Sequence, residues 1–345
     1  MTSETARTAA AAGTPRPGSP IVHTEAGLRS RILYVLARTF AKQAYRAWPL
    51  GDRGIRALSL IDTAAGRIPT LATVEHSPGT LGTVPVERYS CAAVADNQWA
   101  AGASVLYLHG GGFTFCGTGT HRRVTSRMAE ALSVPVYSVL YRQLPHGGVG
   151  SATHDACTAY RSLVESCPDP HKVILAGDSS GGFLAAKICE LAAAEGLPMP
   201  AAYIGYSPQL DLDADERDRD SIRHDALMPI SAYRRAKRHW ARGPVAPRGA
   251  RSMLRVDPTV FPPAFLSAAS GEMFEADIRD FADMLAAAGG IVETHVWHRQ
   301  VHAFPVLDAL LPESREIMRL TVDFLSRSMT RPVTAPPSET QVTAN

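Results

Sequence analysis

Short apolar runs alternate with longer amphipathic stretches over most of the chain. The clearest pair is the apolar run 173–176, typical of a buried strand, followed by the Ala- and Leu-rich helical stretch 183–188. Further strands are predicted at 104–108, 135–140, 202–206, 263–268 and 291–297. Further helices are predicted at 151–165, 276–288 and 313–327. Strands that alternate with helices predict the α/β class, with a mostly parallel central sheet covered by helices on both faces.

The N-terminal part departs from this alternation. Residues 70–75 and 84–90 alternate as strands do, and Pro78-Gly79 predicts the turn between them. Residues 28–48 have a helical apolar stripe, and the other positions carry five Arg and Lys side chains. A basic amphipathic helix of this kind touches a membrane surface or packs on its own protein. We expect packing on the protein, with the basic face in solvent; a lid over an active site fits the same pattern.

The segment 211–249 interrupts the later alternation with a charge run, 213–220, and a predicted helix at 231–242. Interleaved arginines argue against a metal site in that run, so we interpret the segment as a lid piece. Residues 1–20 and 330–345 are poor in large apolar side chains and are expected to be a disordered tail and a flexible tail. Residues 21–329 then form one domain.

Composition narrows the classes of partner. The 345 residues carry a net charge of +2, which gives no reason to expect nucleic acid as the main partner. No run is long enough for a signal peptide or a membrane span, so stable membrane insertion is not expected. The five cysteines form no C-x-x-C pair, which is typical of free thiols in the cytoplasm. Monomer and homodimer are both compatible with the sequence.

Ser179 is the centre of a G-x-S-x-G motif that joins the strand 173–176 to the following helix. A sharp strand-to-helix turn puts the middle side chain at its tip, and the flanking glycines avoid clashes. A serine hydroxyl needs a nearby base to act as a nucleophile, and the base needs an acid to fix its tautomer. In this type of sheet the chain order is serine, then acid, then base.

The candidates for the base are the five histidines after the serine: His224, His239, His295, His298 and His302. His224 and His239 lie in the inserted segment, and His295 lies inside the last predicted strand. The other two follow that strand, where the base belongs. We choose His302, because an apolar loop start follows it, and keep His298 in reserve.

The acid should follow the strand 263–268. Glu272 comes first after that strand and Gly271, so it is the preferred acid. Asp277 is the alternative, although a carboxylate at a helix start is also expected merely as a partner of the helix dipole.

The tetrahedral intermediate of acyl transfer needs N–H donors for its oxyanion. The run His109-Gly110-Gly111-Gly112 follows a predicted strand, and its glycines leave room for a ligand. The expected donors are the N–H groups of Gly111, Gly112 and Ser180, and we expect His109 to hold the loop rather than to act as a second base. A phosphate-binding loop is the competing interpretation, but no Walker or dinucleotide pattern accompanies the glycines.

With these residues in place, the sequence resembles the hormone-sensitive-lipase-like group of α/β-hydrolase esterases (bacterial family IV) over residues 104–325. The family's H-G-G-G-F is residues 109–113, and its G-D-S-A-G-G is residues 177–182, with Ser180 replacing the usual Ala. Residues 207–212 are similar to S-P-W-x-D-L, whereas 141–146 are a degraded Y-R-L-A-P-E, with Asp155 at the position of an acid on the next helix. The usual H-G-F starts at His302. The family's D-P-L-x-D-E is absent, and Glu272 aligns with its catalytic Asp.

The resemblance implies an α/β-hydrolase fold in which segments 26–67 and 211–249 form a helical cap over the acyl pocket. It implies a serine hydrolase that cleaves short- to medium-chain carboxylic esters or lactones through an acyl-enzyme on Ser179, without metal or cofactor. The alternative is an acyltransferase or biosynthetic cyclase with the same Ser-His-acid site. A non-catalytic ligand-binding receptor is less favoured, because such receptors in the family lost the histidine that His302 represents.

Overall fold

A nine-stranded sheet forms the centre of the computed structural model, which describes residues 18–91, 98–216 and 225–330. The strands are β1 (Ile21–His23), β2 (Val74–Leu81), β3 (Val84–Cys91), β4 (Ser104–Leu108), β5 (Val136–Val139), β6 (Val173–Asp178), β7 (Ala202–Tyr206), β8 (Ala264–Ala269) and β9 (Val292–Trp297). Their order across the sheet is β1-β9-β8-β7-β6-β4-β5-β3-β2. Neighbours from β1 to β5 pair in parallel, and β3 and β2 are antiparallel additions at one edge.

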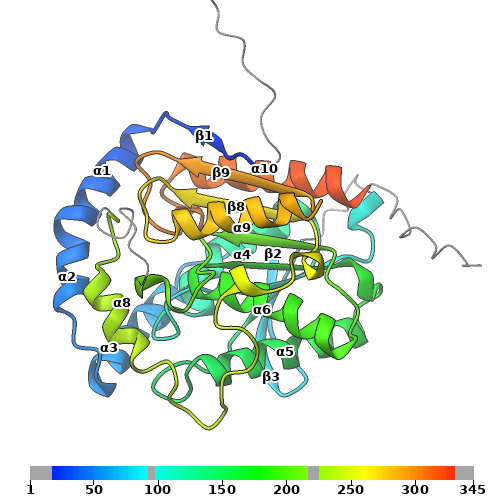
Figure 1. Cartoon of the computed structure of the whole chain (residues 1–345), viewed down its shortest axis with the longest axis horizontal. Coiled ribbons are helices and arrows are strands. Elements are labelled where there is room, and N and C mark those ends of the chain that lie inside the picture. The colour runs from blue at the N-terminus through cyan, green and yellow to red at the C-terminus, as the bar shows by residue number, and fades with distance from the viewer. Residues whose placement is uncertain (1–17, 92–97, 217–224, 331–345) are drawn as a thin grey trace, which may run out of the picture.

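Helices cover both faces of this sheet (Figure 1). They are α1 (Leu28–Leu36), α2 (Lys42–Ala47), α3 (Asp52–Ala65), α4 (Thr118–Leu132), α5 (Val149–Ser166), α6 (Ser179–Glu195), α8 (Ile230–Lys237), α9 (Glu275–Ala287) and α10 (Pro312–Met329). One apolar core joins the sheet to α5, α6 and α9, and a second joins it to α4 and α10. The predicted α/β class is therefore confirmed. The strands β4, β6, β7 and β8 are buried along their whole length, because both of their faces are covered.

The first hairpin differs from the prediction. The strand β2 continues through Pro78 and Gly79, and the turn to β3 falls at Gly82, whose φ is +58°. Because β2 pairs only with β3, it is an edge strand, and an edge position tolerates the missing N–H of proline. The prediction of a turn at Pro78-Gly79 was therefore wrong. The strand β1 and the helices α3 and α4 were not predicted.

The N-terminal helix is where the prediction fails most. The predicted helix 28–48 exists as α1, a π-helical segment (Ala37–Ala41) and α2, and it ends before Trp48, which Pro49 holds in an extended conformation. Most of its apolar stripe does not pack on the protein as expected, although Trp48 at the end of the stripe packs against the core. Leu28, Ile32 and Phe40 are 74%, 51% and 66% exposed, whereas Ser30 on the opposite side is buried.

Ser30 lies inward because its hydroxyl donates to Oε2 of Glu313 at 2.8 Å, and Oε1 of the same carboxylate accepts the N–H of Gly27 at 2.7 Å. A polar anchor from α10 therefore decides which face of α1 points inward.

The inserted segment forms α8, which ends at Lys237 rather than Arg242, because i→i+3 turns follow it. The tails 1–17 and 331–345 lie outside the described residues, as does 217–224 with His224. All five cysteines are free. No helix in the described ranges is both long and apolar enough to cross a membrane.

Candidate active site

Ser179 is the first residue of α6 and follows directly on β6. Its φ is +50°, a left-handed conformation that is strained for a non-glycine residue and typical of a nucleophile at a sharp turn. The turn is also crowded: a Cβ on Gly177 would come within 2.6 Å of the backbone of Gly181. The predicted strand–turn–helix context of the motif is thus present in the structure.

His302 and Glu272 come from the loops after β9 and β8, and both side chains are buried. The Nδ1 atom of His302 lies 2.9 Å from Oε2 of Glu272. Burial by itself would lower the pKa of His302, but the Glu272 carboxylate outweighs that effect and holds this pKa above its usual value. Burial raises the pKa of Glu272, and the facing imidazole offsets the rise in part. Nε2 of His302 has no hydrogen-bond partner among the described residues, so it is available to a group in the cavity.

The residues held in reserve lie elsewhere. His298 is exposed, and its backbone N–H donates to the carbonyl of His23 at the end of β1. His295 is buried inside β9, where its ring nitrogens lie 2.9 Å from His23 and from Glu293. Asp277 is buried in the first turn of α9 and does not line the cavity that holds His302.

The loop after β4 carries the expected oxyanion donors. Gly111 and Gly112 both line the cavity, and their φ values of +113° and +61° place the loop in conformations that favour glycine. Ser180 is in the first turn of α6, where backbone N–H groups have no partner within the helix. The serine that replaces the family's usual Ala at position 180 keeps this backbone N–H and adds a hydroxyl. The Oγ of that hydroxyl accepts the N–H of Gly112 at 2.9 Å.

Buried polar contacts hold this loop against the serine turn. Asp178, next to the serine, accepts hydrogen bonds from Tyr107 at 2.9 Å and from the N–H of Gly110 at 3.0 Å. Its carboxylate also lies 3.0 Å from Nε2 of His121. Burial opposes the charges of this pair, but their mutual attraction prevails and raises the pKa of His121 while it lowers that of Asp178. Sequence reasoning assigned no role to either residue.

His109 holds the loop, as expected. Its Nδ1–H donates to the carbonyl of Gly110 at 2.8 Å, and its ring stacks on Tyr141 with centroids 4.2 Å apart. Burial lowers the pKa of His109 to about 4, so the ring is neutral at pH 7.

Two buried residues that the sequence did not single out contact the loops that carry Glu272 and His302. Ser207, just after β7, accepts the N–H of Ala303 at 3.1 Å, and its hydroxyl offsets part of the rise that burial causes in the pKa of Glu272. Asp225 accepts the N–H of Met273 at 2.8 Å and also the N–H groups of Leu227 and Met228. The only feature of the sequence that could have identified Ser207 is its place in the segment similar to S-P-W-x-D-L. No sequence feature identifies Asp225, because its partner Met273 lies 48 residues away.

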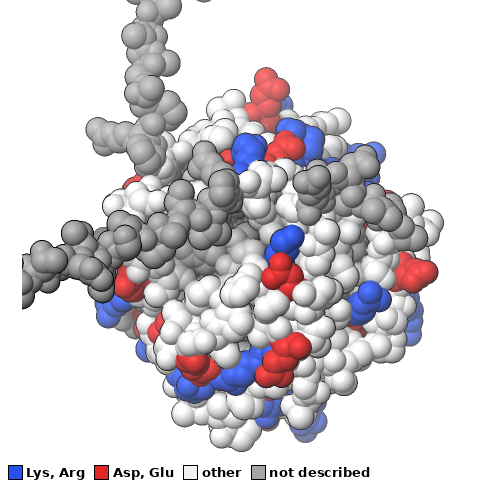
Figure 2. Space-filling model, turned by 90° about the vertical axis from the view of Figure 1, so that its right-hand side faces the viewer, with Lys and Arg blue, Asp and Glu red and all other residues white. Residues whose placement is uncertain are grey.

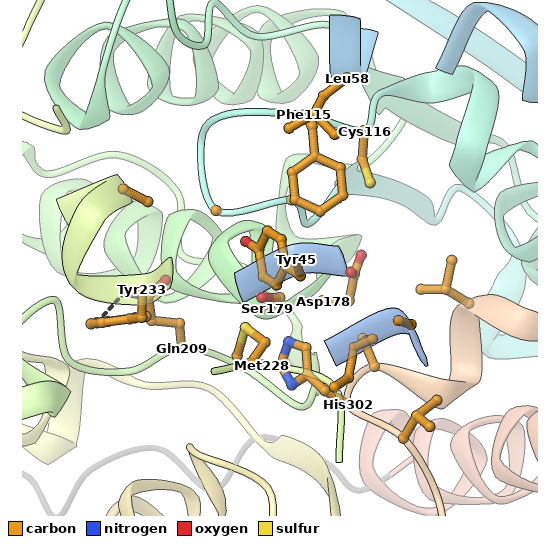
Figure 3. Close-up of a pocket in the computed structure, with 18 of the residues that line it drawn as sticks. Tyr45, Leu58, Phe115, Cys116, Asp178, Ser179, Gln209, Met228, Tyr233 and His302 are labelled. Atoms are coloured by element: carbon orange, nitrogen blue, oxygen red, sulfur yellow. Dashed lines mark hydrogen bonds between the residues drawn. The ribbon is translucent and has the colours of Figure 1, made fainter. Parts of the chain in front are cut away.

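A cavity of about 490 Å³ lies above these groups (Figure 3). Its floor contains Ser179 and His302, and its wall includes Cys116 of the loop after β4. Burial raises the pKa of the Cys116 thiol, which argues against a reactive thiolate there. The remaining walls are mostly apolar side chains from several elements: Tyr45, Trp48, Leu58, Ile61, Phe115, Met228, Tyr233, Trp240 and Phe274.

The two inserted segments supply one side of this cavity and contact each other. Arg235 of α8 donates to the carbonyl of Arg46 at 2.8 Å, at the end of α2. Trp240 donates its indole N–H to the carbonyl of Gly112 at 2.9 Å. The segment 211–249 thus contacts the glycine-rich loop after β4 directly. In the described part of the chain, no cluster of three or more His, Cys, Asp or Glu side chains could hold a metal ion.

Comparison with known proteins decides the family. A sequence profile described as the alpha/beta hydrolase fold matches residues 105–306. The chain belongs to the hormone-sensitive-lipase-like branch of this α/β-hydrolase family. The structure of a hormone-sensitive lipase from a metagenome library superimposes with a TM-score of 0.75 and 25% identity, over 87% of this chain and 98% of that one.

Two esterases from Mycobacterium tuberculosis are similar to this chain in sequence. The carboxylesterase/phospholipase LipF is 33% identical over 233 residues, which are 65% of this chain and 62% of that protein. The chain therefore spans less than two thirds of that relative's length. Esterase LipU is 29% identical over 290 residues, which are 81% of this chain and 93% of that protein.

Proposed function

We propose that the chain hydrolyses carboxylic esters or lactones through an acyl-enzyme on Ser179. The observation that carries this proposal is that Ser179 and His302 line one apolar cavity, with Glu272 behind the imidazole at 2.9 Å. The esterase relatives and the hydrolase family support the reaction class.

The first half of the reaction follows from these positions. Ser179 Oγ attacks the ester carbonyl carbon and gives its proton to Nε2 of His302, the nitrogen that has no partner among the described groups. Glu272 accepts from Nδ1–H, which fixes the tautomer and stabilises the imidazolium that forms. The imidazolium then protonates the leaving alcohol, and the acyl group stays on the serine.

The N–H groups of Gly111, Gly112 and Ser180 stabilise the oxyanion of both tetrahedral intermediates. Since Gly112 N–H already donates to the Ser180 hydroxyl, that hydrogen bond must be shared or released when the oxyanion forms. Water, activated by His302, then cleaves the acyl-enzyme and releases the acid. The helical segments 26–67 and 211–249 act as the cap, and the cavity of about 490 Å³ between them and the serine suits short to medium acyl chains. The five free thiols suit a reducing compartment such as the cytoplasm.

The test is hydrolysis of p-nitrophenyl butyrate by the purified chain and by Ser179→Ala. We expect kcat to fall by several orders of magnitude with the fold unchanged, because the attacking oxygen is removed. Stoichiometric labelling of the parent, but not of the variant, by a fluorophosphonate provides the control. Unchanged turnover would exclude the mechanism, and a product ester formed from an added alcohol would identify acyl transfer instead of hydrolysis.

A further inference from the structure

The outward face of the N-terminal helix is apolar. Leu28, Ile32, Val35, Leu36 and Phe40 recur at helical spacing and are 47–74% exposed. We call these five residues the outer stripe. Eight of the 13 exposed large apolar side chains in the described chain lie within residues 28–68, so exposure of this kind is concentrated here. An exposed apolar patch of this sort marks an interaction surface.

The same segment is strongly basic. Residues 26–67 contain eight Arg and Lys and two Asp, a net charge of +6, whereas the whole chain carries +2, which leaves −4 for the remainder. Arg29, Arg31, Arg38 and Arg46 are exposed beside the stripe. The side of the molecule opposite to α1–α3 instead carries acidic and basic side chains intermixed (Figure 2). A partner for this surface must therefore be both apolar and negatively charged.

The outer stripe leads to the cavity. Leu36 and Phe40 line a shallow apolar groove of about 540 Å³ on the surface of the helix. The groove and the cavity above Ser179 share five wall residues: Ala41, Ala44, Leu227, Val301 and Leu307. An apolar chain lying in the groove thus reaches the wall of the cavity that holds Ser179 and His302.

We propose that the outer stripe and its arginines dock the enzyme on an anionic lipid surface, and that the groove guides acyl chains from that surface toward Ser179. The inference rests on the proposed ester hydrolysis and extends it to amphiphilic esters held in a lipid layer. An amphipathic helix with basic flanks binds such an interface through apolar burial and attraction to anionic headgroups. A second copy of the chain fits this face less well, because a two-fold interface would place the same arginines opposite one another.

Binding is measured by co-sedimentation of the full-length Ser179→Ala protein with vesicles, so that hydrolysis does not alter the membrane. We expect binding to equimolar phosphatidylglycerol/phosphatidylcholine vesicles to exceed binding to pure phosphatidylcholine by about tenfold or more, and to weaken in high salt. The combined changes Leu28→Gln, Ile32→Gln and Val35→Gln should lower binding about tenfold or more, since they remove apolar area without adding helix breakers. Leu310→Gln, at a comparably exposed apolar position outside the stripe, should have no effect.

The charge is tested separately by Arg31→Gln with Arg38→Gln, which leaves the outer stripe intact and should reduce only the preference for phosphatidylglycerol. In the Ser179-containing protein the triple glutamine variant should hydrolyse p-nitrophenyl butyrate at the parental rate, because none of its three positions lines the cavity or the groove. Its hydrolysis of a long-chain ester embedded in anionic vesicles should fall about tenfold or more.

Equal binding to both vesicle types, or none, would overturn the docking proposal, as would a dimer in light scattering that the triple variant dissociates. Vesicle binding without hydrolysis of any ester would instead refute the proposed function and leave the docking intact. Circular dichroism and thermal unfolding of each variant show whether a loss of binding reflects a loss of fold.

Discussion

Replacing Glu272 by Gln should isolate the contribution of the carboxylate charge from that of the other groups in the site. The change keeps the size of the side chain but removes its charge, 2.9 Å from Nδ1 of His302. Both side chains are almost fully buried, at 2% and 9% exposure, so bulk water cannot take over the role of the carboxylate. The glutamine can present its amide nitrogen to the ring, which selects the tautomer with the proton on Nε2, and it cannot stabilise an imidazolium.

The expected loss in kcat is about 10³- to 10⁴-fold, equivalent to about 4–5.5 kcal/mol of transition-state stabilisation. Glu272→Asp should lose less. Removing one C–C bond length, about 1.5 Å, takes the carboxylate beyond direct hydrogen-bond reach of Nδ1 but keeps its charge. We expect about a 10- to 100-fold loss for this variant. Asp277→Asn, a buried carboxylate outside the cavity, should stay close to the parent and serves as the matched control.

The pH profile gives an independent readout. A reaction that needs neutral His302 gains activity as the pH rises through the pKa of that residue, and the Glu272 carboxylate holds this pKa above its usual value despite burial. The residual activity of Glu272→Gln should therefore have its acid limb at lower pH than the parent. The assay is kcat and kcat/KM for p-nitrophenyl butyrate from about pH 5 to about pH 9. A Glu272→Gln variant within tenfold of the parent, or an Asp277→Asn variant equally impaired, would refute the assignment.

Three other changes test the supporting groups. Ser180→Ala frees the N–H of Gly112 for the oxyanion, so kcat should rise about fivefold at unchanged KM in the p-nitrophenyl butyrate assay; a tenfold fall would mean that the hydroxyl assists catalysis. Asp225→Ala deprives three backbone N–H groups of their acceptor and should lower the free energy of unfolding in urea by about 3 kcal/mol and kcat about tenfold; parental values in both would contradict its positioning role. Asp155→Asn weakens the bidentate contact with Arg142, so Tm should fall by a few degrees while kcat stays parental, and a large loss in kcat would place this pair in the reaction.

The arrangement of the candidate site follows from topology that the sequence displays. Alternating strands and helices predict a parallel sheet, and the carboxyl ends of parallel strands meet at one edge. Ser179, Glu272 and His302 each follow a different predicted strand, so they were expected to meet, and the structure brings Glu272 and His302 into contact beside the cavity that Ser179 lines. The local sequence was enough to predict these three residues, because each could be identified by its position directly after a predicted strand.

Residues that act through distant partners could not be predicted in this way. Asp225 is one of many polar residues in the segment 211–249, so nothing local distinguishes it. Its importance arises from its contact with the backbone N–H of Met273, far along the chain. Pro78 shows the reverse case, in which local chemistry suggested a turn. Pairing at the sheet edge made a strand favourable at that position, and no pattern within the hairpin indicates which strand is at the edge.

In the N-terminal helix, the local pattern predicts the helix correctly, but the contacts of its two faces depend on distant parts of the chain. Periodicity identifies a helix with an apolar stripe but not the surface that the stripe meets. In the structure, Ala44 and Tyr45 line the cavity, whereas Ile32 and Val35 point to solvent on the same helical segment. Folding needs only the inward face, because α1 is already held by the hydrogen bonds of Glu313. The outward apolar face adds nothing to the packed core, so its chemistry is best explained by a partner outside the protein.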